Sequence, residues 1–156
     1  FETTELNGVF YRTPTVEAVC GWRDATPPDF VFAWKASKYI THWKRLTATS
    51  RSSLTLMESR LRLLGPKLGP VLFQLPPRFK SNRERLAGFL KLLKAKRRYT
   101  FEFRHESWYE PPILDLLRDH DMSLCDGSAA GAMSTSISTT TRKAPRRSTR
   151  GGWPDF

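Results

Sequence analysis

The chain has 156 residues, of which 39% are hydrophobic and 12% aromatic, enough for one modest domain with a packed core, which argues against disorder along its whole length. No apolar stretch approaches the ~20 residues that span a bilayer, which excludes a membrane-embedded protein and makes a cytoplasmic location the default expectation. The formal net charge of +11 is typical of nucleic-acid-binding proteins, but much of it falls on predicted helices, where a solvated face explains it as well.

Five short apolar runs predict the strands of one sheet. They are Phe1 to Leu6, Phe30 to Ala36, Val71 to Leu75, Tyr99 to Phe103 and Met122 to Cys125. Helical patterns separate the later runs. The first places Leu54, Met57, Leu61 and Leu64 on one face and ends at Gly65 and Pro66, the second follows the capping residues Ser81 and Asn82, and the third begins near Pro111.

The alternation of strands and helices predicts an α/β fold with about five parallel strands and crossover helices. A repeat of about 30 residues suits both a doubly wound open sheet and a barrel, and periodicity does not separate them. A complete barrel needs roughly 250 residues, so a barrel here would be an incomplete, TIM-barrel-like one. Gly65 and Gly69 are interpreted as turn glycines at a helix end rather than as a phosphate-binding loop.

The segment Tyr99 to Trp108, with the sequence Y-T-F-E-F-R-H-E-S-W, is the strongest candidate for a functional site. Its two phenylalanines alternate with Glu102 and Arg104, so the rings face one side of the strand while the carboxylate and guanidinium share the other. His105 follows the strand directly. Because parallel α/β folds bind ligands at the carboxyl ends of their strands, this segment predicts a site.

The other strand ends carry polar side chains of similar kinds. They are Glu5, Asn7 and Tyr11 after the first run, Lys35 and His42 after the second, Gln74 before two prolines after the third, and Asp126 after the fifth. Two carboxylates with an imidazole suit proton transfer or a divalent metal, and Lys35 and Arg104 suit an anionic substrate. The alternative is a salt-bridge network without catalysis, in which Glu102 is tied to Lys35 or Arg104.

These residues divide into two predicted roles. We expect Glu5, Lys35, Glu102, His105 and Asp126 to be catalytic, and Asn7, Tyr11, His42, Gln74, Arg104 and Trp108 to contact a ligand. The cofactor is left open, with a divalent metal as one candidate. Trp22, Trp34, Trp43 and Trp108 could form a stacking platform for a base or sugar, although filling the core is the favoured interpretation of these rings.

Four blocks of the sequence resemble, in the same order, the YecE-like family, also called domain of unknown function 72. They are E-L-N-G-V-F-Y-R-T-P, F-V-F-A-W-K-A-S-K-Y-I-T-H-W-K-R-L, L-G-P-K-L-G-P-V-L-F-Q-L-P-P and the segment Y-T-F-E-F-R-H-E-S-W. The resemblance covers residues 1–126 and implies a TIM-barrel-like α/β fold with no assigned activity. It singles out the same strand-end residues, apart from Tyr11.

Residues 127–156 lie beyond these four blocks. They are rich in Ser, Thr, Arg, Gly and Ala without apolar periodicity, which is typical of a disordered basic tail. A shift of one base through the codons of Ser136 to Thr141 permits a run that the family carries near its C-terminus, so our hypothesis is a frameshift. The family's Gly-rich opening strand also has no counterpart, and we therefore expect residues 1–126 to be a partial domain.

Together these patterns predict an uncharacterised TIM-barrel-like protein whose intact form is an enzyme acting on a polar or phosphorylated small molecule. Two alternatives stay open. One is a nucleic-acid-associated binding protein, whose affinity would fall steeply with salt. The other is a non-functional product of a damaged gene.

Overall fold

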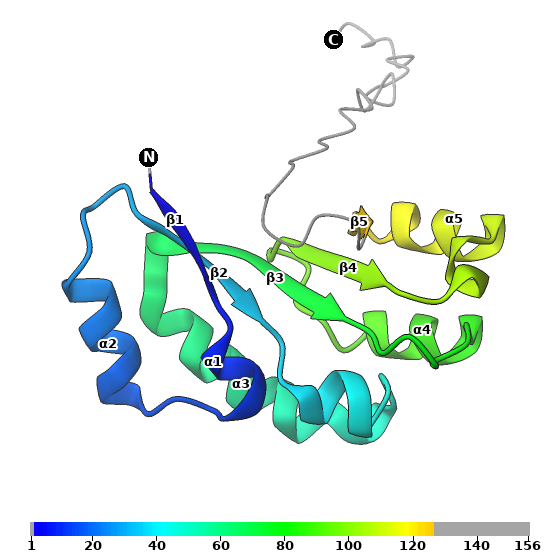
Figure 1. Cartoon of the computed structure of the whole chain (residues 1–156), viewed down its shortest axis with the longest axis horizontal. Helices are drawn as coiled ribbons and strands as arrows, with labels where there is room; N and C mark the ends of the chain where they lie inside the picture. Colours follow the sequence, from blue (N-terminus) through cyan, green and yellow to red (C-terminus); the bar gives the residue numbers. More distant parts are fainter. Residues whose placement is uncertain (1, 127–156) are drawn as a thin grey trace, which may run out of the picture.

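In the computed structural model, which describes residues 2–126, five parallel strands form one sheet in the order β1-β2-β3-β4-β5 (Figure 1). Their bounds are β1 Thr3–Leu6, β2 Val31–Lys35, β3 Leu68–Gln74, β4 Tyr99–Phe103 and β5 Ser123–Asp126. All five predicted strands are confirmed, although β3 begins at Leu68 rather than Val71. The predicted tail of residues 127–156 and its frameshift lie outside the described residues.

The strand order identifies the kind of α/β fold. Each strand pairs in parallel with its neighbours in sequence, and the order does not reverse. A doubly wound sheet reverses its order at the ligand-binding crevice, so the described strands do not form one. The sheet is open, with β1 and β5 at its edges, and residues 2–126 do not close it into a barrel. The carboxyl ends of all five strands therefore lie along one edge.

Helices connect consecutive strands. They are α1 Gly8–Tyr11, α2 Val16–Asp24, α3 Arg51–Leu64, α4 Arg83–Leu90 and α5 Pro111–Asp119, together with the π-helix η1 Tyr39–Trp43 and the 3-10 segments Ala48–Ser50, Gly65–Lys67 and Glu106–Tyr109. At α4 the predicted cap is present, since Asn82 Oδ1 accepts the Arg85 N–H at 2.9 Å. None of the helices in residues 2–126 has the length and apolar character needed to cross a membrane.

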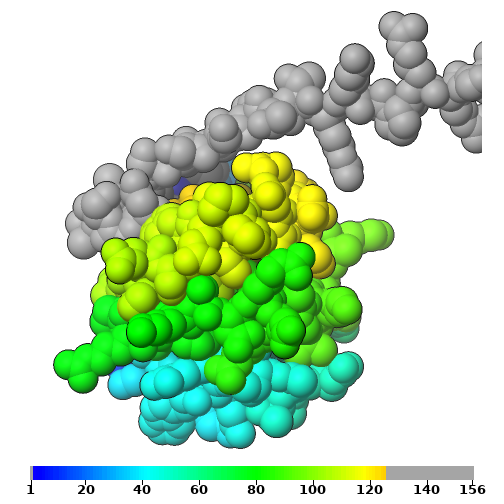
Figure 2. All heavy atoms as spheres, turned by 90° about the vertical axis from the view of Figure 1, so that its right-hand side faces the viewer, coloured from blue at the N-terminus to red at the C-terminus, as the bar shows by residue number. Residues whose placement is uncertain are grey.

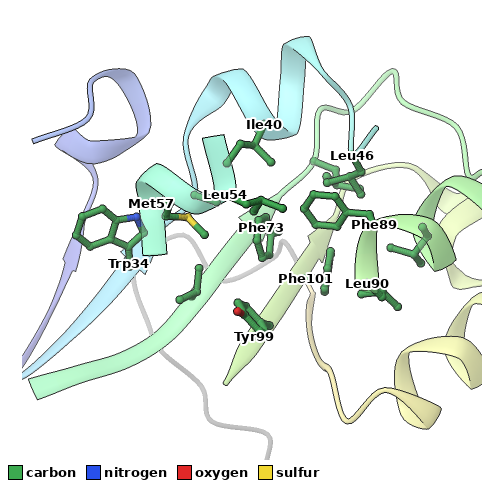
Figure 3. Packing of buried hydrophobic residues seen from close by; sticks show 14 of the residues in the cluster. Trp34, Ile40, Leu46, Leu54, Met57, Phe73, Phe89, Leu90, Tyr99 and Phe101 are labelled. Carbon is green, nitrogen blue, oxygen red and sulfur yellow. The ribbon is translucent and has the colours of Figure 1, made fainter. Parts of the chain in front are cut away.

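The two faces of the sheet differ in burial. Six side chains on the helix-covered face are no more than 3% exposed: Phe32, Trp34, Val71, Phe73, Phe101 and Phe103. Figure 3 shows Phe73 of β3 between Leu54 and Met57 of α3 on one side and Phe89 of α4 on the other. Seen from the side of α4 and α5, the successive strand-helix units stack in sequence order (Figure 2). Lys35, Gln74 and Glu102 lie on the opposite face of the sheet.

Gly65 and Gly69 are glycines for different structural reasons. Gly65 ends α3 with a φ of 56°, a conformation that favours glycine, so its turn is confirmed. Gly69, which we had interpreted as a turn residue, lies inside β3 instead. A Cβ at this position would come within 2.7 Å of Val31 Cγ1 and 3.0 Å of the Phe32 carbonyl oxygen. Gly69 therefore permits the close approach of β3 to β2.

Candidate functional site

The ends of β3 and β4 hold a buried carboxylate. Gln74 and Glu102 are register partners on the two strands, and Gln74 Nε2 donates to Glu102 Oε1 at 2.9 Å. Arg104 Nε donates to the same oxygen, also at 2.9 Å. Glu102 is only 8% exposed, and burying a carboxylate is costly unless charged or polar donors reach it. These two donors hold the Glu102 carboxylate in position, and the pair with Arg104 is the one that the salt-bridge alternative named.

The two hydrogen bonds to Glu102 leave one of its oxygens free. Both donors reach Oε1, and Oε2 has no hydrogen-bond partner among residues 2–126. An ionised carboxylate is an acceptor at both oxygens. Glu102 therefore presents an oriented, unused acceptor at the strand ends, where a ligand hydroxyl or a labile proton could be received.

The ends of β1 and β2 hold a looser set of similar groups. Lys35 Nζ lies 3.4 Å from Asn7 Oδ1 and 3.9 Å from Glu5 Oε1, and it sits 5.0 Å from the centre of the Phe10 ring. A separation of 3.9 Å is too long for a hydrogen bond. Since an ammonium group has three donors, Lys35 retains hydrogen-bonding capacity for a ligand.

His42 lies close to both sets of residues. It belongs to η1 and is half-buried, with Nδ1 2.8 Å from Thr41 Oγ1 and its ring edge-on to Phe10 at 5.3 Å. Burial lowers the pKa of His42, and the nearby positive charges, which include Arg104 and Lys35, lower it further. His42 is therefore a neutral imidazole at neutral pH, able both to donate and to accept a hydrogen bond.

The loop that carries His42 has unusual backbone geometry. Its π-helix is followed by Arg45 and Leu46, whose φ angles of 46° and 61° lie in the left-handed region that non-glycine residues rarely adopt. Leu46 is fully buried, so core packing holds this conformation. π-Helical turns and left-handed non-glycine residues occur frequently at functional sites.

His105 and Trp108, both predicted to be site residues, have local structural roles in the fold. His105 Nδ1 accepts the Ser107 N–H at 3.2 Å and caps the 3-10 segment that follows β4. Trp108 is fully buried, stacks on Phe103 at 4.8 Å and donates its indole N–H to the Phe79 carbonyl oxygen. The structure therefore places Trp108 in the core, where it cannot contact a ligand at the strand ends.

The remaining predicted residues are Tyr11, Asp126 and the tryptophans. Tyr11 is 77% exposed at the end of α1 and contacts Phe10 with its ring. Asp126 ends β5 opposite Phe103 in the register, and its side chain is outside the described part of the structure. The four tryptophans do not form a platform, because Trp34 and Trp108 are buried while Trp43 is 70% exposed.

The described residues show no group of three or more His, Cys, Asp or Glu side chains that could hold a metal ion. The strand order explains this result for the two predicted carboxylates. Glu5 is on β1 and Glu102 is on β4, three strand spacings apart, or roughly 14 Å between backbones. Each is next to its own cation instead, Glu5 to Lys35 and Glu102 to Arg104.

Two residues near the strand ends were not assigned a catalytic or ligand-contacting role from the sequence. Phe10 contacts His42 and lies beneath the Lys35 ammonium, and Thr41 is hydrogen-bonded to His42. Phe10 follows the first predicted strand and could have been inferred from that position. The role of Thr41 depends on η1, and a single π-helical turn has no periodic pattern in the sequence.

Comparisons with known proteins place the chain in one family. The family model described as "Protein of unknown function DUF72" matches residues 1–150, so the match continues past residue 126, the end of the resemblance described above. UPF0759 protein YecE of Escherichia coli K12 is 32% identical over 111 residues, covering 70% of this chain and 40% of that protein. UPF0759 protein YunF of Bacillus subtilis is 30% identical over 123 residues, covering 74% and 43%. The chain thus spans less than half the length of these curated relatives.

Solved structures agree with these sequence matches. A crystal structure of a DUF72 family protein from Enterococcus faecalis superimposes with a TM-score of 0.66 at 24% identity, covering 78% of this chain and 53% of that one. A DUF72 family protein from Thermotoga maritima gives a TM-score of 0.59 at 26% identity, covering 80% and 49%. The arrangement of strands and helices described above therefore recurs in experimentally determined structures.

Proposed function

Because this chain belongs to the DUF72 family, whose members are described as proteins of unknown function, its side chains are the guide to its chemistry, and we propose that the strand-end residues form an enzyme site for a small polar molecule with an anionic group. The anionic group, a phosphate or a carboxylate, would be bound by Lys35 and Arg104. Glu102 would accept a proton or a hydroxyl hydrogen from the same molecule.

The free oxygen of Glu102 is the observation that carries this proposal. A carboxylate in a purely structural ion pair would be expected to use both oxygens, as an arginine fork allows. Here Gln74 and Arg104 share Oε1, and Oε2 has no partner in residues 2–126. A carboxylate that is held in position with one unused oxygen is suited to general-base catalysis.

The cations at the site also have unused donors. Arg104 uses Nε for Glu102, while its terminal nitrogens have no partner in the described part of the chain, and its side chain is 46% exposed. Lys35 has only its long contacts to Asn7 and Glu5. Two incompletely paired cations beside a neutral imidazole favour an anionic ligand, because an anion would gain charge-assisted hydrogen bonds from both.

The test is an NMR titration of the whole chain with two probes, inorganic phosphate and glycerol 3-phosphate. We expect saturable binding of both probes, and tighter binding of glycerol 3-phosphate because its hydroxyls can reach Glu102. Lys35→Met should weaken both probes by about tenfold. Glu102→Gln should remove most of the advantage of glycerol 3-phosphate, while Glu84→Gln, an exposed change on α4, should have no effect.

Two results would reject the proposed site. The first is that neither probe binds saturably to the folded chain. The second is that Lys35→Met and the exposed control Lys91→Met bind both probes alike, since general positive charge would then explain the binding.

The nucleic-acid alternative has one observation in its favour. Trp43 and Tyr39 are 70% and 41% exposed beside one another on η1, and Lys44 Nζ lies 5.4 Å from the centre of the Tyr39 ring. Exposed rings with adjacent cations can stack on bases. Affinity for single-stranded DNA that falls steeply with salt and is lost in Trp43→Ala would favour this function over the small-molecule site.

A further inference from the structure

A cavity lies on the helix-covered face of the sheet, separate from the strand-end residues. It has a volume of about 330 Å³ and is lined by one face of α3 from Arg51 to Arg62, by residues 92–94 after α4, and by Tyr99 at the start of β4. We call it the α3 groove. Its volume is at the lower end of the range of about 300–1,000 Å³ that small-molecule pockets have.

The groove has an apolar floor. Leu54 and Met57 of α3 contribute buried side chains to one wall, and Leu92 and Leu93 on the opposite wall are partly buried against the core. Figure 3 shows Leu54 and Met57 on one side and Leu90 of α4 on the other, with Phe73 between them. The side chain of Phe73 thus separates the apolar side chains of α3 from those of α4.

The rim of the groove is positively charged. Arg51 and Arg62 lie eleven residues apart on α3, roughly 16 Å along the helix axis, and Lys94 lies on the opposite wall. The buried carboxylate at the centre, Glu58, is already neutralised by Arg97, whose Nη2 is 2.6 Å from Glu58 Oε1. Arg62 reaches the same oxygen only at 3.6 Å.

The remaining cations of the rim are unpaired. Neither the Arg51 guanidinium nor the Lys94 ammonium has an ion-pair partner among the described residues. With Glu58 already neutralised, the groove has an excess of positive charge over its apolar floor. This combination is complementary to a molecule with an apolar body and an anionic head.

Tyr99 adds a buried hydrogen-bond donor. Its side chain is 3% exposed, and its hydroxyl oxygen accepts the Lys94 backbone N–H at 3.2 Å. The hydroxyl hydrogen has no acceptor among residues 2–126. Burial raises the pKa of Tyr99, so the hydroxyl stays protonated and can donate to an oxygen of a bound molecule.

The geometry points to the α3 groove as a binding site for a small amphipathic carboxylate, with its unbranched apolar chain along the Leu54 and Leu93 walls and its head group paired with the rim cations. Both features of the ligand are needed. The apolar chain matches the apolar side chains that line the groove, and the carboxylate matches the charges of Arg51 and Lys94, which have no ion-pair partner in the described part of the chain.

The test uses decanoate as the probe and isothermal titration calorimetry on the full chain. We expect saturable one-site binding, with the affinity falling about fourfold for each methylene removed between decanoate and octanoate. Decyltrimethylammonium, which has the same chain with a cationic head, should bind at least tenfold more weakly. Lys94→Gln should weaken decanoate binding about two- to fivefold, whereas Lys91→Gln, an exposed change outside the groove, should not.

A steric variant gives an independent test of the location. Thr55 is exposed on α3 and lines the groove, so Thr55→Trp should fill the groove and weaken decanoate binding at least tenfold. Ser52 is exposed on the same helix but does not line the groove, so Ser52→Trp should leave decanoate binding unchanged. The inference is overturned if decanoate does not bind saturably, if the two tryptophan variants bind it alike, or if decyltrimethylammonium binds as tightly as decanoate. Binding at the strand ends is measured with different probes, so either site can fail without the other.

Discussion

The strand-end site consists of two halves that use the same kinds of side chain but hold them differently. The carboxylate, carboxamide and cation are Glu102, Gln74 and Arg104 in the β3–β4 half, and Glu5, Asn7 and Lys35 in the β1–β2 half. In the first half both donors lie 2.9 Å from one oxygen of the carboxylate. In the second half the cation lies 3.4 Å from the carboxamide and 3.9 Å from the carboxylate.

Burial explains the difference between the halves. The Glu102 side chain is 10% exposed, and because little water reaches it, the protein has to supply its donors. The Glu5 side chain is 33% exposed and can be hydrated, so its contacts need not be close. The comparison indicates that the β3–β4 half is a fixed element of the site, while the β1–β2 half can rearrange around a ligand.

Removing the carboxamide from each half gives the largest expected contrast. Gln74→Ala leaves a buried carboxylate with one donor fewer, and we expect the free energy of unfolding to fall by about 1–3 kcal/mol. Asn7→Ala, at an exposed position with only a long contact, should change it by less than about 0.5 kcal/mol. Urea unfolding followed by circular dichroism measures both. Equal effects of the two variants would contradict the distinction between a fixed and an adaptable half.

Exchanging the two types of cation should have a smaller effect. Arg104→Lys replaces the Nε–H that reaches Glu102 with a flexible ammonium, so we expect a loss of up to about 1 kcal/mol in the free energy of unfolding, limited by the exposure of this side chain. Lys35→Arg should be close to neutral, because Lys35 has no short bond whose geometry must be kept. If Lys35→Arg proved the more damaging change, the β1–β2 half would be the more constrained of the two.

The pH dependence tests His42, which lies beside both cations. Folding lowers the pKa of His42, so the unfolded chain binds a proton at this residue more readily than the folded chain does. The neutral imidazole therefore contributes to stability above the ordinary histidine pKa of about 6.5. This contribution is lost as the pH falls below that value. We expect His42→Asn to reduce the decline in stability between about pH 7 and pH 5. The effect should be modest, since His42 is only half-buried. Urea midpoints that fall equally in both proteins over this range would show that His42 does not contribute.

Most of the fold could be predicted from the sequence, because its signals are local. The run Tyr99–Phe103 alternates rings with polar side chains, and the strand β4 has the same bounds. The start of β3 could not be predicted, since Gly69 and Pro70 are typical of turns and only the close approach to Val31 shows why glycine is needed inside this strand. The short helix α1 and the π-helix η1 could not be predicted either, because each is too short to show a periodic pattern in the sequence.

The site could be predicted only in part. Lys35, Gln74 and Glu102 could be predicted to lie together. All three are at the carboxyl ends of parallel strands, and the alternation of side chains along each strand places them on the same face of the sheet. Sequence proximity to Glu102 did not predict that Trp108 packs in the core against Phe103. Which oxygen of Glu102 is free depends on side-chain geometry across two strands, and no spacing in the sequence encodes it.

The smallest expected effect concerns Glu5, and it examines the adaptable half most directly. Glu5→Gln removes a charge that lies 3.9 Å from Lys35 in a partly exposed setting, where ion pairs contribute little, so the free energy of unfolding should change by less than about 0.5 kcal/mol. The same change leaves the Lys35 ammonium with less competing negative charge. We therefore expect Glu5→Gln to bind inorganic phosphate slightly more tightly than the unaltered chain, by NMR titration, and Glu2→Gln, an exposed change just before β1, to bind it as the unaltered chain does. A clear loss of phosphate affinity in Glu5→Gln would mean that Glu5 positions Lys35, and the β1–β2 half would then be as fixed as its counterpart.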